Sequence, residues 1–162
     1  MSTRSNIGYF DPIAKTGRVV YCHYDGYPEH NGRILKEHYS TPDKIIKLVE
    51  LGALSVLGTE IGDKVDFERN SRDDEYAKSV SGQVFAFHRD RGDELEIEKF
   101  DADNFDHFLE LVSDSLADNG YIEFVYLTET YAGCNEPVKW IMLDRKQEIA
   151  DYFERRRMQN AA

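Results

Sequence analysis

The stretch Val19–Tyr39, VVYCHYDGYPEHNGRILKEHY, decides the fold. Its first residues alternate as in a half-buried strand, and Asp25–Pro28 is a cluster of turn-forming residues. A helical pattern begins near Asn31, so the order strand, turn, helix predicts that the chain leaves a sheet here and crosses one of its faces. Three of the five histidines also lie in this stretch, which makes it the first place to look for a site.

The rest of the 162-residue chain predicts further strands and helices around this unit. Strands are expected over Ser5–Phe10, Arg18–Tyr24, Gln83–Arg89, Leu95–Phe100, Tyr121–Thr130 and Val138–Leu143. Helices are expected over Asn31–Tyr39, Pro42–Leu51, Asp101 or Asp103 to Asp118, and Arg145–Met158. The predicted fold is α+β, one globular domain over residues 1–162, with a mostly antiparallel sheet and helices packed on one face.

Two segments give weaker patterns. Leu54, Val56 and Leu57 fit either a turn of helix or an edge strand. Lys64–Lys78 is mostly polar and predicts a surface loop. Arg89–Asp93 is expected to be the hairpin loop between two strands, with Asp90 at its tip.

Composition excludes several classes of protein. The net charge of −11 disfavours direct binding to nucleic acid or anionic membranes and favours a partner with a basic surface. There is no apolar run long enough to span a membrane, and the first residues lack a secretory signal, so a cytoplasmic protein is expected. Cys22 and Cys134 are expected to be reduced thiols, and the spacings typical of metal ligands are missing, so no metal or cofactor is predicted.

Charge is concentrated in residues 100–138, which hold nine acids and no lysine or arginine. The helix within this segment has an apolar face at Phe105, Phe108, Leu109, Val112 and Leu116. Carboxylates on its outer face recur about every 6 Å, a pitch that can imitate a row of phosphates. The expected partner-binding residues are Asp103, Asp106, Glu110, Asp114 and Asp118. The alternative is an ordinary solvated face of an acidic protein.

A second group of residues could form a pocket for a nucleotide or phosphate. It consists of Arg4, His23, Asp25, Tyr27, His38, Arg89 and Arg91, with His38 expected on the core side of its helix. No convincing pairing of a nucleophile with a base is present, and Cys22 lies inside a strand, where a thiol is buried and inert. No catalytic residue is therefore assigned, and binding is favoured over turnover.

The segments Ser2–Ile7 (STRSNI), Tyr21–Pro28 (YCHYDGYP) and Arg89–Gly92 (RDRG) resemble those of an uncharacterised group of small phage and prophage proteins. The resemblance implies a viral accessory protein that binds and inhibits a host factor in the host cytoplasm. It supplies no catalytic residue. The leading hypothesis is thus a non-enzymatic inhibitor acting through the acidic face, and the alternative is a protein that sequesters a nucleotide or phosphate.

Overall fold

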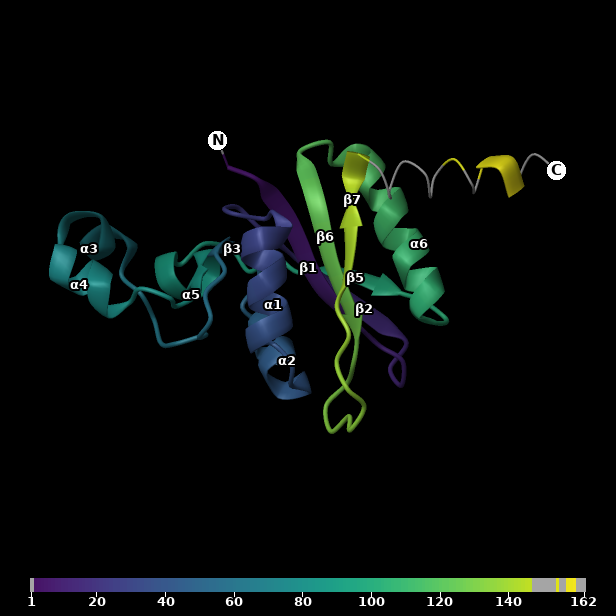
Figure 1. The fold of residues 1–162 in the computed structure, drawn as a ribbon, viewed down its shortest axis with the longest axis horizontal. Helices are drawn as coiled ribbons and strands as arrows, with labels where there is room; N and C mark the ends of the chain where they lie inside the picture. Colours follow the sequence, from purple (N-terminus) through teal and green to yellow (C-terminus); the bar gives the residue numbers. More distant parts are fainter. Residues whose placement is uncertain (1, 147–153, 155–156, 160–162) are drawn as a thin grey trace.

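The computed structural model describes residues 2–146, 154 and 157–159, and a seven-stranded mixed sheet lies at the centre of the molecule (Figure 1). The strands are β1 (Arg4–Asp11), β2 (Thr16–Cys22), β3 (Leu54–Val56), β4 (Phe85–Ala86), β5 (Glu98–Asp101), β6 (Ile122–Glu129) and β7 (Ile141–Asp144). The helices are α1 (Arg33–His38), α2 (Pro42–Glu50), α3 (Phe67–Arg72), α4 (Asp74–Ser79), α5 (Phe87–Arg91) and α6 (Phe105–Ser115). The α+β class expected from the sequence is confirmed.

The strand order β4-β3-β2-β1-β6-β7 places β1 and β2 in the middle of the sheet. β1 and β2 form an antiparallel hairpin in which Ile7 faces Val20. The carboxylate of Asp11 closes the turn between them by accepting hydrogen bonds from the amides of Ile13 and Ala14, at 2.9 and 3.0 Å. β6 runs parallel to β1, and β7 returns antiparallel to β6. The sheet is therefore mixed.

The stretch that begins in β2 folds as strand, turn and helix, as the sequence predicts. A π-helical turn, Pro28–Gly32, leads into α1. The buried side chain of Asn31 stabilises this turn, because its Nδ2 lies 3.4 Å from both the hydroxyl of Ser5 and the carbonyl of Tyr24. The start of α1 is thereby fixed to the ends of β1 and β2.

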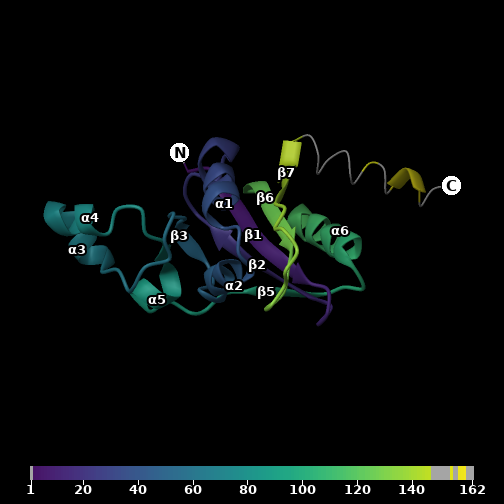
Figure 2. The same ribbon diagram turned by 60° about the horizontal axis from the view of Figure 1, so that its bottom comes forward.

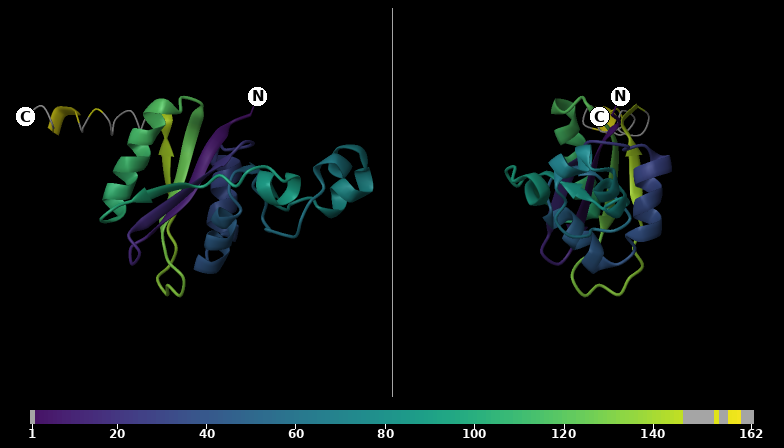
Figure 3. Two further views of the ribbon diagram at one scale, coloured as in Figure 1. Left: turned by 180° about the vertical axis from the view of Figure 1, so that it is seen from behind. Right: turned by 90° about the vertical axis from the view of Figure 1, so that its left-hand side faces the viewer.

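Helices cover both faces of the sheet, so the expectation of helices on one face was wrong. Leu35 of α1 and Leu48 of α2 belong to a core on one face, whereas Phe108 and Val112 of α6 belong to a core on the other. The right-hand view of Figure 3 shows the strands between α1 and α6. The run Ser5–Phe10 of β1 is buried at every position, which is typical of a strand covered on both sides.

The polar segment predicted as a loop, Lys64–Lys78, instead contains α3 and α4. Each helix begins at an aspartate whose carboxylate accepts a backbone amide of the first turn. Asp66 binds the amide of Arg69 at 3.0 Å, and Asp73 binds the amide of Tyr76 at 3.1 Å. Neither helix has a buried residue, so no apolar periodicity marked them in the sequence.

The hairpin expected around Arg89–Asp93 was also wrong. The strand β4 ends at Ala86, and the chain turns directly into α5, which Gly92 terminates in the left-handed conformation (φ 82°). β4 pairs with β3, whereas β5 pairs antiparallel with β2. The strands β3 and β5 thus occupy two ends of the same outer edge of β2, since Cys22 pairs with β3 and Thr16–Val19 pairs with β5.

The acidic helix α6 packs through the predicted apolar face. Its N-cap is Asn104, not Asp101 or Asp103, because the side-chain oxygen of Asn104 accepts the amide of His107 at 2.8 Å. Leu54 and Val56, for which a turn of helix and a strand were both left open, lie in the short strand β3. Of the predicted terminal helix, residues 147–153 and 155–156 lie outside the described part of the chain.

Candidate ligand-binding cleft

A cleft of about 470 Å³ lies where the parallel strands β2 and β3 end. We call it the aromatic cleft and define it by His23, Tyr24, Phe67, Phe85, Phe87 and Arg91. Two backbone hydrogen bonds continue the pairing of β2 with β3 into the cleft. The amide of His23 donates to the carbonyl of Leu54 at 2.9 Å, and the amide of Tyr24 donates to the carbonyl of Ser55 at 3.1 Å. Carboxyl ends of parallel strands are a common place for ligands in open sheets.

Three phenylalanines form the apolar wall of the cleft. The ring of Phe67 in α3 meets that of Phe85 edge-on at 5.6 Å and stacks against that of Phe87 at 6.2 Å. The guanidinium of Arg91 lies over the same rings, 4.7 Å from Phe87 and 5.6 Å from Phe67. A planar cation resting on aromatic faces is favourable and leaves a flat, amphipathic surface.

Arg91 is held in place by Asp93. Its Nε and Nη2 donate to the two carboxylate oxygens at 2.9 and 2.7 Å. These hydrogen bonds lower the pKa of the Asp93 carboxyl and raise that of the Arg91 guanidinium. The pair orients the guanidinium but offsets part of its charge, so Asp93 competes with any anion that approaches Arg91.

A chain of hydrogen bonds orients His23. Arg4 Nε donates to the hydroxyl of Tyr21 at 3.1 Å, and that hydroxyl lies 2.6 Å from His23 Nδ1. Since an arginine nitrogen only donates, the Tyr21 oxygen accepts from Arg4 and its own hydrogen is free for His23. Burial raises the pKa of Tyr21 and keeps this phenol protonated. The contact with Tyr21 thus fixes the orientation of the His23 ring.

The structure therefore brings together His23 and Arg91 from the group proposed on sequence, with Arg4 acting on His23 through Tyr21. Asp25 lies in the turn after β2 with φ 56°, and its carbonyl accepts the amide of Asn31. Tyr27 is exposed and packs near His30, with ring centroids 6.1 Å apart.

His38 does not face the core as expected. It is exposed at the end of α1, beside the carboxylate of Glu37.

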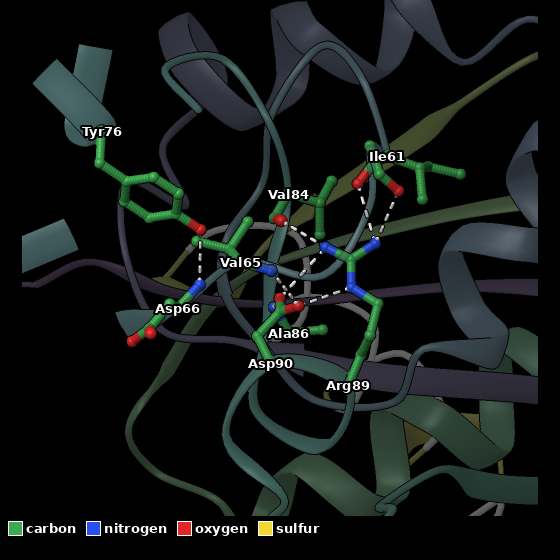
Figure 4. Close-up of polar contacts among 9 residues, drawn as sticks. Ile61, Val65, Asp66, Tyr76, Val84, Ala86, Arg89 and Asp90 are labelled. Carbon is green, nitrogen blue, oxygen red and sulfur yellow. Dashed lines mark hydrogen bonds and ion pairs between the residues drawn. The ribbon is translucent and has the colours of Figure 1, made fainter. Parts of the chain in front are cut away.

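The guanidinium of Arg89 does not line the cleft and instead binds groups of the chain itself (Figure 4). Its Nη1 donates to the carbonyls of Ile61 and Gly62 at 3.0 Å, and its Nη2 donates to Val84 at 2.8 Å. Its Nε donates to the carboxylate of Asp90 at 2.7 Å. With its donors used in this way, Arg89 connects α5 to the chain after β3.

Asp90 is the buried centre of the same cluster. Its carboxylate also accepts the amides of Val65 and Ala86, at 2.8 and 2.7 Å (Figure 4). The amide of Asp66 donates to the Tyr76 hydroxyl at 2.8 Å, which ties α4 to the same segment. The cluster positions α3 and α5, and hence both sides of the aromatic cleft.

The acidic residues of the leading hypothesis lie on and before α6. Asp103, Asp106, Asp114 and Asp118 are exposed, and Glu110 is half-buried. The carboxylate of Asp103 lies 3.7 Å from the His107 imidazole. Glu110 and Asp114 each already have an interaction within the chain. The carboxylates on the outer face of α6 are therefore not all equally available to a partner.

Sequence reasoning missed the phenylalanine wall. Phe67 lies in a segment predicted as a loop, and Phe85 and Phe87 were assigned to one continuous strand. The available signal was the pair of capping aspartates, Asp66 and Asp73, each placed before a short polar run.

Among residues 2–146, 154 and 157–159, no cluster of three or more histidine, cysteine or acidic side chains could hold a metal ion. In the same part of the chain, no helix is long and apolar enough to cross a membrane. Comparison of the chain with models of protein families, with curated proteins and with solved structures found no match.

Proposed function

We propose that this protein binds and holds a small ligand of the nucleotide class, a planar heteroaromatic ring with an anionic group, in the aromatic cleft. The observation that carries the proposal is the position of the Arg91 guanidinium over Phe67 and Phe87 in the same cleft as His23. Flat aromatic surfaces favour stacking with a planar ring, and Arg91 favours a neighbouring anion. The imidazole of His23 adds a polar group to the lining of the cleft.

We propose binding without turnover. The one cysteine near the cleft, Cys22, is fully buried, and burial raises the pKa of its thiol to about 11. Such a thiol stays protonated at neutral pH and is a poor nucleophile. The function therefore rests on affinity and on exclusion of the bound ligand from solution.

The test is titration calorimetry with nucleoside monophosphates and their uncharged nucleosides. Arg91→Gln is expected to weaken binding of the monophosphate about tenfold, since it removes a charged hydrogen-bond donor. Arg72→Gln is the matched control, because Arg72 is an exposed arginine of α3 that pairs with Glu68 outside the cleft.

The substitution Asp93→Asn sharpens the test. It removes the carboxylate that competes for Arg91, so monophosphate affinity is expected to rise while nucleoside affinity stays the same. Equal effects on charged and uncharged ligands would contradict an anion bound at Arg91. No binding by any ligand of the panel would contradict the proposed function itself.

A second candidate is the inhibitor of a host factor implied by the phage resemblance. It is favoured by the exposure of Asp103, Asp106 and Asp118 in a segment without lysine or arginine. We propose that these carboxylates contact a basic protein partner. Reversal of Asp106 and Asp118 to lysine should abolish capture of a host protein that elutes at moderate salt, because salt screens such contacts. Unchanged capture would exclude this surface.

A further inference from the structure

A second, larger cavity of about 870 Å³ lies between α1 and β7. We call it the basic groove and define it by Arg33, Lys36, Tyr126, Lys139, Trp140 and Met142. In Figure 2, α1 lies to the left of β7, the edge strand of the sheet. None of the residues considered for the aromatic cleft lines it.

The floor of the groove is apolar and comes from the sheet. Tyr126 of β6 and Met142 of β7 are register partners, so their side chains lie next to each other on the face covered by α1. Val138, Trp140 and Met142 are only partly buried there. The helices α1 and α2 leave this part of the face open, and Met is a side chain that adapts to different apolar partners.

The walls are fixed by two hydrogen bonds across the groove. Trp140 Nε1 donates to the carbonyl of Tyr39 at 2.9 Å, and the Tyr126 hydroxyl donates to the carbonyl of Gly26 at 2.6 Å. A Cβ on Gly32 would lie 3.2 Å from the Tyr126 ring, so glycine lets the start of α1 approach the sheet closely. The shape of the groove is therefore built into the fold and does not require a ligand.

The rim is cationic on both sides. Arg33 and Lys36 lie one turn apart on α1, and Lys139 lies on the opposite wall. All three are exposed, and no hydrogen bond or ion pair within the described residues uses their side chains. Within the described part of the chain, Glu37 is the single acid in the lining of the groove. Such a concentration of cations stands out in a chain with a net charge of −11.

From this juxtaposition we infer that the basic groove docks a short segment of a partner protein in which an apolar side chain is flanked on both sides by acids. Cations on opposite walls need carboxylates on both sides of the anchor, which a segment of peptide supplies. The apolar floor, formed by Tyr126, Val138 and Met142, suits an apolar anchor between the acids. The charge complementarity sets orientation and association rate.

Trp140 is the only tryptophan of the chain, so its fluorescence reports directly on the groove. The probe is a blocked hexapeptide with two leucines between pairs of glutamates, titrated into the full-length protein. Its binding is expected to change Trp140 emission saturably and to weaken as salt is raised. A peptide with lysines in place of the glutamates, and one with alanines in place of the leucines, should give no saturable change.

Variants separate the groove from general charge effects. Lys36→Glu and Lys139→Glu are each expected to weaken binding of the acidic peptide about tenfold. Lys47→Glu is the matched control, since it changes the net charge equally from an exposed position on α2 outside the groove. Equal loss in all three variants would overturn the inference.

Two further results would also overturn it. One is equal binding of the acidic and lysine-containing peptides. The other is a concentration-dependent dimer that Lys36→Glu dissociates, because the groove would then bind a second copy of this chain. These readouts do not depend on the aromatic cleft, so they stand whether or not a nucleotide binds there.

Discussion

At the scale of single residues, Asp90 has more influence on the fold than its place in the sequence suggests. It lies between Arg89 and Arg91, a pattern that predicted an exposed turn. Instead its carboxylate is buried and accepts two backbone amides and the guanidinium of Arg89. The two arginines beside it also differ: Arg89 donates to backbone carbonyls and to Asp90, whereas Arg91 lines the aromatic cleft.

Asp90→Asn is expected to lower the free energy of unfolding by about 3 to 5 kcal/mol. The new side-chain amide cannot accept on both sides, so a buried backbone amide loses its acceptor while Arg89 loses its counterion. Urea denaturation measures the change. Asp93→Asn is the control, since Asp93 pairs with Arg91 at the surface and should alter stability far less. Similar losses in both variants would contradict a structural role specific to Asp90.

At the scale of elements, periodicity predicted the elements that have an apolar side and missed the polar ones. The strands β1, β2, β6 and β7 and the helices α1, α2 and α6 each have an apolar side that the core requires. The helices α3 and α4 have no such side, and their ends are set by capping aspartates. The error at β4 and α5 arose because the buried carboxylate of Asp90 accepts the amide of Ala86, the last residue of β4, which a pattern of alternation does not show.

The start of α6 provides a test of capping. Asn104→Ala is expected to lower the free energy of unfolding by about 1 kcal/mol, because the amide of His107 loses its side-chain acceptor. Asp101→Ala should cost less, since Asp101 lies at the end of β5 and not at the cap. Chemical denaturation of both variants measures the difference, and a larger loss for Asp101→Ala would refute the assignment of the cap.

At the scale of the whole molecule, the core around β2 buries a thiol and two phenols that lose their protons only at high pH. Burial raises the pKa of Cys22 to about 11, and burial also raises the pKa values of Tyr39 and Tyr126. Each group binds its proton more tightly in the folded chain than in the unfolded chain. The contribution of Cys22 to stability is complete below pH 9.0, its ordinary pKa, and is lost as the pH rises through about 11. The two tyrosines, whose ordinary pKa is 10.0, lose their contribution at a higher pH.

The free energy of unfolding is therefore expected to fall steeply above pH 9, by about 3 kcal/mol from Cys22 alone. Ionisation also adds negative charge to a chain that already carries −11, which increases self-repulsion. Urea denaturation between pH 8 and pH 11 measures the fall. Cys22→Ala should show a shallower slope than the wild type over this range, and identical slopes would contradict the role given to the thiol.

The sequence allowed prediction of the α+β class and of most long elements, but only part of the candidate site. His23 follows a recognisable strand, so its position at the end of a sheet could be anticipated. The convergence of Arg91 with Phe67 could not, because it depends on α3 and α5, whose ends are set by capping and by Asp90. The cover on both faces could not be read from β1, because its buried run includes the polar residues Ser5 and Asn6.

The chain between β3 and β5 begins and ends on one edge of β2, at Cys22 and at Thr16–Val19. Residues 57–97, which include α3, α4, β4 and α5, thus form an excursion from the edge of β2 that lies outside the strand order β2, β1, β6 and β7. This excursion supplies the phenylalanines and Arg91, whereas β2 supplies His23. Substitutions within this one segment can therefore change what the cleft recognises without touching the strands β1, β6 and β7.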